Sequence, residues 1–193
     1  MINIPDYYTK VDSMPEDPEN SIPYCTRSSQ AEVFAMVYPI ELEQAMPFDD
    51  VQKLIDGIHA QLGDNQGLIE VGRNSTKDGQ AYIYSIVKTL LEPHGVQYTL
   101  SYQMIKDGGI IQLQGFFSEA GTTGQRDALV YAALSSEGKI GDDLSGWTED
   151  PYDPNYKHGA LMNLSEAEHV DEMFPEHPLT MARELKNFIN ENN

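Results

Sequence analysis

The chain has 193 residues, of which 31 are acidic and 12 basic, so its net charge at pH 7 is -19. Such a surface repels nucleic acids and anionic lipids, and we expect neither as a partner. The single cysteine, Cys25, excludes an internal disulfide framework and a cysteine-rich zinc module. We interpret it as a small buried apolar side chain rather than a nucleophile.

The length fits one domain, residues 1–193, in which the composition separates three parts. Residues 1–23, rich in proline and acids, predict an irregular N-terminal arm, and residues 24–136 predict a core of sheet and helices. Residues 137–193 carry about half of the net charge and predict an acidic extension with two short helices. The N-terminus lacks the pattern of a signal peptide, and no apolar run approaches the roughly 18 residues of a membrane span. We therefore expect a cytoplasmic protein without a membrane partner.

The first part of the core predicts a strand, a helix and a second strand. Apolar residues dominate 31–38 and stop at Pro39, which indicates the strand. After Pro47, two aspartates suit the positive end of a helix dipole, and an apolar stripe follows at helical spacing until Gly63. Residues 67–72 predict the second strand.

The segment from residue 80 to 117 predicts a three-strand antiparallel meander. From Val96 the chain alternates apolar and polar residues, as a half-buried strand does, and Asp107-Gly108 suits a two-residue type I′ turn. This turn places Met104, Tyr102, Leu100 and Tyr98 opposite Ile111, Leu113, Gly115 and Phe117, and Gln103 and Ser101 opposite Gln112 and Gln114. Because a slip of one residue would turn one strand's apolar side chains outward, the pattern fixes the register.

A glycine-containing loop at 121–124 leads into a helix predicted over 128–134. The loop lacks the lysine of a phosphate-binding loop, so we interpret it as structural. We expect Thr122 or Thr123 to cap the helix, and Arg126 and Asp127 to form local ion pairs. The helix is apolar nearly all round, which predicts that it is buried.

The C-terminal part predicts a wrapping connection followed by helices. We expect Trp147, Tyr152 and Tyr156 to hold the connection over 135–159. Ser165 and Glu168 fit a capping box, which predicts a short helix that stops near residue 173. A last helix should begin at residue 178, with a frayed end at 190–193.

Neither GxSxG nor HExxH occurs in the sequence, and no paired-carboxylate context stands out, so we predict no catalytic residue, cofactor or metal ligand. His158, His169 and His177 lie among carboxylates, and Glu166 and His169 have the Glu-x-x-His spacing of some metal sites. One such motif is fewer than a di-metal bundle needs. We interpret these carboxylates as surface and capping groups.

The order of elements resembles a known family. A strand leads into Tyr38-Pro39 and an amphipathic helix, the meander ends in Gly115-Phe116-Phe117-Ser118-Glu119, and Gly124-Gln125-Arg126-Asp127 begins a helix. Over residues 24–136 this resembles the fold shared by the Ran-binding Mog protein and the PsbP photosystem subunit. The resemblance implies an antiparallel sheet with helices packed on it, no enzymatic activity, and binding of other proteins. The acidic part from residue 137 departs from that pattern, and no residue indicates Ran or a photosystem as the partner.

These observations predict an α+β fold, an antiparallel meander with helices packed on it as in an α/β/α sandwich, followed by a helical C-terminal extension. The predicted function is a non-enzymatic protein-binding module (an adaptor, chaperone or immunity-type partner) whose partner is a protein; the acidic surface favours a basic one, and the sequence leaves the oligomeric state open. Candidate partner-binding residues are polar and aromatic side chains of the meander and of the loop after it: Tyr82, Tyr84, Gln103, Gln112, Gln114, Glu119 and Arg126. The alternative is a small-molecule or metal-dependent enzyme with a site near 119–127, where Glu119 and Asp127 would form an acid/base pair.

Overall fold

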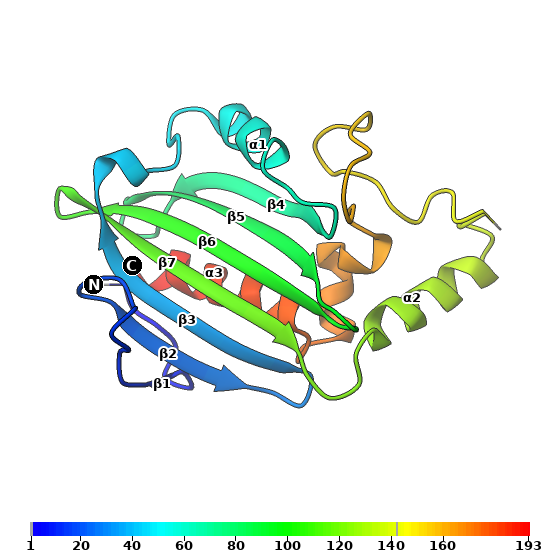
Figure 1. Cartoon of the computed structure of the whole chain (residues 1–193), viewed down its shortest axis with the longest axis horizontal. Coiled ribbons are helices and arrows are strands. Elements are labelled where there is room, and N and C mark those ends of the chain that lie inside the picture. The colour runs from blue at the N-terminus through cyan, green and yellow to red at the C-terminus, as the bar shows by residue number, and fades with distance from the viewer. Residues whose placement is uncertain (1, 142) are drawn as a thin grey trace.

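In the computed structural model, which describes residues 2–141 and 143–193, seven strands form one antiparallel sheet (Figure 1). The strands, in chain order, are β1 (Thr9–Lys10), β2 (Ile22–Arg27), β3 (Ala31–Ile40), β4 (Gln66–Ser75), β5 (Ala81–Leu90), β6 (Val96–Lys106) and β7 (Gly109–Glu119). Their order across the sheet is β1-β2-β3-β7-β6-β5-β4. The fold is therefore α+β, as predicted.

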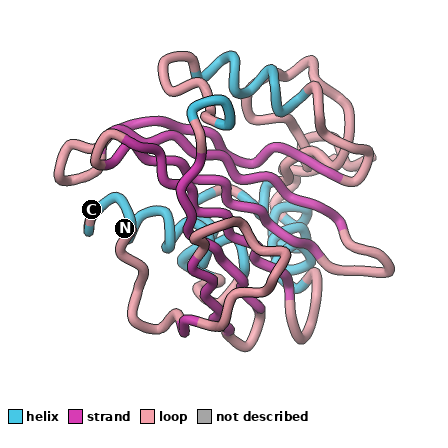
Figure 2. Tube along the Cα trace, turned by 60° about the vertical axis from the view of Figure 1, so that its left-hand side comes forward, coloured by secondary structure: helices cyan, strands magenta, loops and turns pink. Residues whose placement is uncertain are grey.

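Helices lie on both faces of the sheet (Figure 2). On one face, α1 (Val51–His59) covers β4 and β5, and on the other α3 (Pro178–Asn192) packs against β3, β6 and β7. The remaining α-helix, α2 (Gln125–Ser136), extends beyond the end of the sheet (Figure 1). Three short 3-10 helices complete the described elements: η1 (Leu42–Gln44), η2 (Leu164–Glu166) and η3 (Glu168–Met173).

The main core lies between α3 and the sheet. Leu179, Ala182, Leu185 and Ile189 have no exposed surface, and they pack on the apolar faces of β3, β6 and β7. A smaller core joins α1 to the opposite face through Leu54 and Ile55, which contact Leu68, Val71 and Ile83. Both clusters follow from a helical stripe placed on an alternating strand.

The predicted hairpin is confirmed residue by residue. Tyr98 pairs with Phe117, Leu100 with Gly115, Tyr102 with Leu113 and Met104 with Ile111, while Gln103 pairs with Gln112 and Ser101 with Gln114. The turn residues Asp107 and Gly108 have φ angles of 54° and 79°, as a type I′ turn requires.

The N-terminal arm is less irregular than predicted. It contains β1, which pairs with β2, a strand that the sequence did not predict because Pro23 lies within it. Proline is tolerated there because β1 is only two residues long, so β2 is nearly an edge strand.

The prediction of a buried helix over 128–134 was wrong. Within α2 only Arg126 and Val130 are buried, and Leu129 is 53% exposed. Packing against Val170 and Phe174 covers only one side of the helix. The expected threonine cap is also absent, because the N-cap is Gly124 in the left-handed conformation, with φ of 70°.

The C-terminal extension differs from two short helices. The expected capping box is shifted by two residues: Asn163 is the N-cap and Glu166 occupies N3, and the helix that begins there is the short η2. The last helix, α3, has 15 residues and continues to Asn192, and Asn193 is buried rather than frayed.

The wrapping connection is held by its three aromatic residues, as expected. Trp147 contacts the Tyr131 ring edge-on, and Tyr156 stacks on His59 with ring centroids 4.0 Å apart. The hydroxyl of Tyr152 accepts from the Val71 N–H at 2.5 Å and lies 3.1 Å from the Val71 carbonyl oxygen, to which it donates. The connection is thereby attached to α1, α2 and the outer edge of β4.

Candidate functional site

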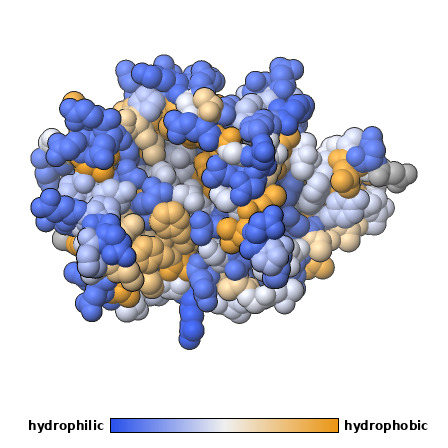
Figure 3. All heavy atoms as spheres, viewed as in Figure 1, coloured by the Kyte–Doolittle hydropathy of each residue, from blue (hydrophilic) through white to orange (hydrophobic). Residues whose placement is uncertain are grey.

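The sheet face that carries α1 is only partly covered. We call the uncovered part, formed by β2, β3, β7 and β6, the open face; it faces the viewer in Figure 1, with α3 behind the sheet. Phe34 and Phe116 lie directly opposite each other in the β3–β7 register, and both are half-buried. They line a groove of about 700 Å³ that also includes Val11, Cys25, Arg27 and Glu32. Figure 3 shows hydrophobic side chains near the middle of this face, bordered by hydrophilic ones.

Three of the predicted partner-binding residues lie on the open face. The Gln103 side-chain amide donates to Gln112 Oε1 at 2.9 Å, and the Gln112 amide donates to Gln114 Oε1 at 2.8 Å. Gln103 itself is covered, because it also accepts from the Met46 backbone N–H and donates to the Gln44 carbonyl. Gln112 and Gln114 are half-buried and lie nearest to solvent on this ladder.

Tyr82 and Tyr84, grouped with these glutamines in the sequence analysis, lie on the opposite face. Tyr82 pairs with Met104 and Tyr84 with Tyr102, whose side chains face α3. Glu119, the last residue of β7, and Arg126, in the first turn of α2, belong to a buried charge network at the end of the sheet. The structure therefore divides the seven predicted residues among three places, and their role in partner binding stays a prediction.

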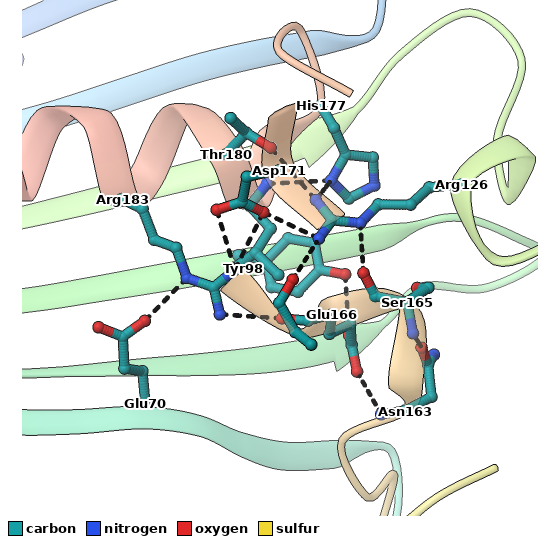
Figure 4. A network of polar contacts seen from close by, with 12 residues as sticks. Glu70, Tyr98, Arg126, Asn163, Ser165, Glu166, Asp171, His177, Thr180 and Arg183 are labelled. Carbon is teal, nitrogen blue, oxygen red and sulfur yellow. Dashed lines mark hydrogen bonds and ion pairs between the residues drawn. The ribbon is translucent and has the colours of Figure 1, made fainter. Parts of the chain in front are cut away.

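Arg126 is the centre of that network (Figure 4) and is 1% exposed. Its guanidinium donates to the Ser165 carbonyl at 2.7 Å, to Asp171 Oδ1 at 2.8 Å and to Thr180 Oγ1 at 3.2 Å. The local ion pairs expected for Arg126 and Asp127 are not formed: Arg126 pairs with Asp171, 45 residues away, and Asp127 accepts from Ser165 and Asn163. Arg126 thus joins α2 to η2, η3 and α3.

A second part of the network fixes α3 to the sheet. Arg183 donates to Asp171 Oδ1 at 3.0 Å and to Glu70 Oε2 at 2.8 Å, and Lys186 donates to Glu70 Oε1 at 2.5 Å. Burial disfavours the charge of Glu70, but Lys186, Tyr84 and Arg183 outweigh this cost and hold its pKa below the usual range.

A third part surrounds Glu166, which is 1% exposed. Its carboxylate accepts from Lys88 Nζ at 2.7 Å, from the Asn163 N–H at 2.8 Å and from the Tyr98 hydroxyl at 2.9 Å. Burial and the nearby carboxylates raise the pKa of Tyr98 well above its ordinary value, so it remains a donor.

His177 connects this network to Glu119. Its Nδ1 accepts from the Leu179 N–H at 3.2 Å, which assigns the ring proton to Nε2, 3.6 Å from Glu119 Oε1. Burial opposes the charge of Glu119, but His177 and the N–H groups of Gly124 and Val96 lower its pKa.

The network was missed by the sequence analysis because the two members of each of its ion pairs lie 12 to 116 residues apart in the chain. One signal was present: Arg183 and Lys186 occur at helical spacing with the apolar stripe of α3, on the side that faces the sheet. Basic residues on a buried stripe require buried acids.

The residues of the alternative enzyme site do not converge on one cleft. Glu119 accepts backbone N–H groups, Arg126 is enclosed, and Asp127 is bonded to the segment over 163–165. His158 lies near the Leu62 carbonyl, whereas His169 is exposed on η3. Within residues 2–141 and 143–193, no group of three or more His, Cys, Asp or Glu could hold a metal ion. No helix in the described part of the chain is long and apolar enough to cross a membrane.

Glu70 gives the stability of the protein a defined acid dependence. Because its folded-state pKa is lowered, its stabilising effect is complete above the unfolded pKa of about 4.3 and is lost as the pH falls through the folded pKa. We expect Glu70→Gln to unfold at a lower urea concentration than the native chain at pH 7, and the difference to shrink below pH 4.3 or so. The midpoints of urea unfolding of both proteins, between pH 7 and pH 3, measure this difference in stability. Glu137→Gln, which alters an exposed carboxylate, should change little at either pH; a Glu70→Gln deficit that persists at pH 3 would contradict the assignment.

Comparison with known proteins gives only distant likenesses. No family model matches the chain, and no curated protein matches it. Among solved structures, the PsbP protein of the cyanobacterium Synechocystis shares 16% identity and a TM-score of 0.39, covering 70% of this chain and 81% of that one. Protein PA94 of Pseudomonas aeruginosa, described as of unknown function, shares 12% identity and a TM-score of 0.40, covering 68% of this chain and 93% of its own. Likenesses of this degree do not assign the chain to a family.

Proposed function

We propose that this protein is a non-enzymatic binding module that takes a protein partner on its open face. The observation that carries the proposal is the groove around Phe34 and Phe116, two aromatic side chains that remain partly exposed on the part of the sheet face that α1 does not cover. Soluble monomers rarely leave contiguous apolar surface uncovered without a function. Aromatic side chains in pockets are also the groups that contribute most to interfaces.

The charge distribution favours a basic partner. Four of the twelve basic side chains, Lys88, Arg126, Arg183 and Lys186, are buried in the network. They cannot offset the exposed acids, so the solvent meets a surface poorer in basic groups than the composition indicates. A basic protein would be attracted to this surface, and an apolar side chain of it would fill the groove.

Affinity co-purification from the native host, at low and moderate salt, tests the proposal. We expect one basic protein in stoichiometric amount with the native chain, lost as salt rises because screening weakens charge attraction. Phe116→Ser should lose it at both salt concentrations. Leu42 is also apolar, but it lies outside the groove and is 76% exposed. The Leu42→Ser variant should therefore retain the partner. Equal recovery by both variants, or no stoichiometric partner with the native chain, would sink the proposal.

A further inference from the structure

A second cavity, of about 350 Å³, lies where the end of β5 and the start of β6 meet the wrapping connection. Lys88, Asn163 and Glu166 are buried at its floor, whereas Leu90 and Thr148, which also line it, are exposed. This gradient of burial describes a pocket that opens to solvent. It is separate from the open face and independent of the function proposed above.

Two floor residues have hydrogen-bond donors without protein acceptors. The Lys88 ammonium carries three N–H groups, and its one acceptor among the described residues is Glu166 Oε2, at 2.7 Å. The Asn163 amide carries two N–H groups and donates one, to Asp127 Oδ2 at 3.1 Å. Glu166 is different, because three donors already satisfy its two oxygens. Each of these two nitrogens can therefore donate to a further oxygen, which a molecule in the cavity could supply.

The charges around the cavity select the kind of molecule that can supply those oxygens. One ammonium (Lys88) and two carboxylates (Asp127 and Glu166) line it. An anion would be repelled by the excess of negative charge around the cavity, and a cation would be repelled by the Lys88 ammonium. A hydroxyl group suits both, since it accepts from an ammonium or amide N–H and donates to a carboxylate.

We propose that this cavity binds a small neutral polyhydroxy compound, such as a cyclic polyol or a monosaccharide. Its hydroxyl groups would accept from Lys88 and Asn163 and donate to Asp127. Leu90 and Leu161 provide apolar wall for the carbon skeleton. The volume is at the lower end of the roughly 300–1,000 Å³ of ligand sites, which fits a single ring.

Saturation-transfer NMR with the intact protein tests this proposal. The probes are myo-inositol, D-glucose, D-ribose and sorbitol, with inorganic phosphate as the anionic comparison. We expect saturable binding of at least one polyol and none of phosphate. Asp127→Asn should weaken that binding about tenfold, as loss of a hydrogen bond to a charged group does.

A variant that fills the cavity distinguishes binding inside it from nonspecific binding elsewhere on the protein. Leu161→Trp, at the cavity wall, should abolish polyol binding, while Leu164→Trp, at a nearby leucine outside the cavity that is 39% exposed, should leave it unchanged. Thermal unfolding first checks that both variants fold. Lys88 is not the position to change, because its loss would leave Glu166 buried without its cation. No binding of any polyol would mean that the cavity holds water, and phosphate binding or an unaffected Leu161→Trp would equally overturn the proposal.

Discussion

Replacing Arg126 with methionine is expected to lower the free energy of unfolding by about 3–5 kcal/mol, the usual cost of removing one partner from a buried ion pair. Methionine matches the apolar stem but donates no hydrogen bond. The Ser165 carbonyl and the Thr180 hydroxyl would lose a donor, and Asp171 would keep only Arg183. Urea unfolding followed by circular dichroism measures the loss.

A matched ion pair at the surface controls for this change. Lys139 contacts Glu137 at 2.7 Å, close to the 2.8 Å between Arg126 and Asp171, but its side chain is 63% exposed. Lys139→Met should therefore cost about 0.5 kcal/mol or less. Equal losses in the two variants would show that burial of the network does not determine its contribution.

Gly67→Ala is expected to destabilise the fold by about 3 kcal/mol, at the upper end of the usual cost of overpacking. A Cβ at residue 67 would lie 1.7 Å from the Ala160 carbonyl oxygen and 3.3 Å from Lys88 Cε. Because the first contact is with backbone, the segment around residue 160 must move. That movement would break the hydrogen bond from the Ala160 N–H to the Gln66 carbonyl, 2.8 Å long.

Gly57→Ala is expected to stabilise the fold, in contrast to Gly67→Ala. Gly57 lies inside α1, and a Cβ there would meet nothing within 4 Å. Alanine should stabilise the helix by about 0.5–1 kcal/mol relative to glycine. Urea unfolding of both variants, together with limited proteolysis of residues 137–163, measures the pair. Early cleavage of this segment in Gly67→Ala alone would show that the segment around residue 160 has moved. Unchanged stability of Gly67→Ala would refute the close contact between residue 67 and the Ala160 carbonyl.

What could be predicted from the sequence was local. The β6–β7 register depends on alternation within two neighbouring strands and on one Asp-Gly turn, so nearby residues determine it. Pro23 shows the limit of such reasoning: whether a proline is tolerated in a strand depends on its neighbour, and β1 lies 12 residues upstream of β2.

The candidate sites were only partly predictable for the same reason. Alternation placed Gln103, Gln112 and Gln114 together, but the face occupied by Tyr82 and Tyr84 depends on pairing with β6 and on where α3 packs. The exposure of α2 likewise depends on which elements touch it. The ion pairs of the network join β4, β5, η2, η3 and α3, and no short-range pattern identifies such partners.

The hydroxyl of Tyr152 has a consequence for how copies of this chain meet one another. β4 is the last strand on its side of the sheet, and the Val71 N–H and C=O are the kind of groups that an incoming strand would bond. Tyr152 bonds both of them already, so one side chain takes the place of an eighth strand at that point. An incoming strand would therefore find the backbone groups of Val71 occupied as long as the wrapping connection stays in place.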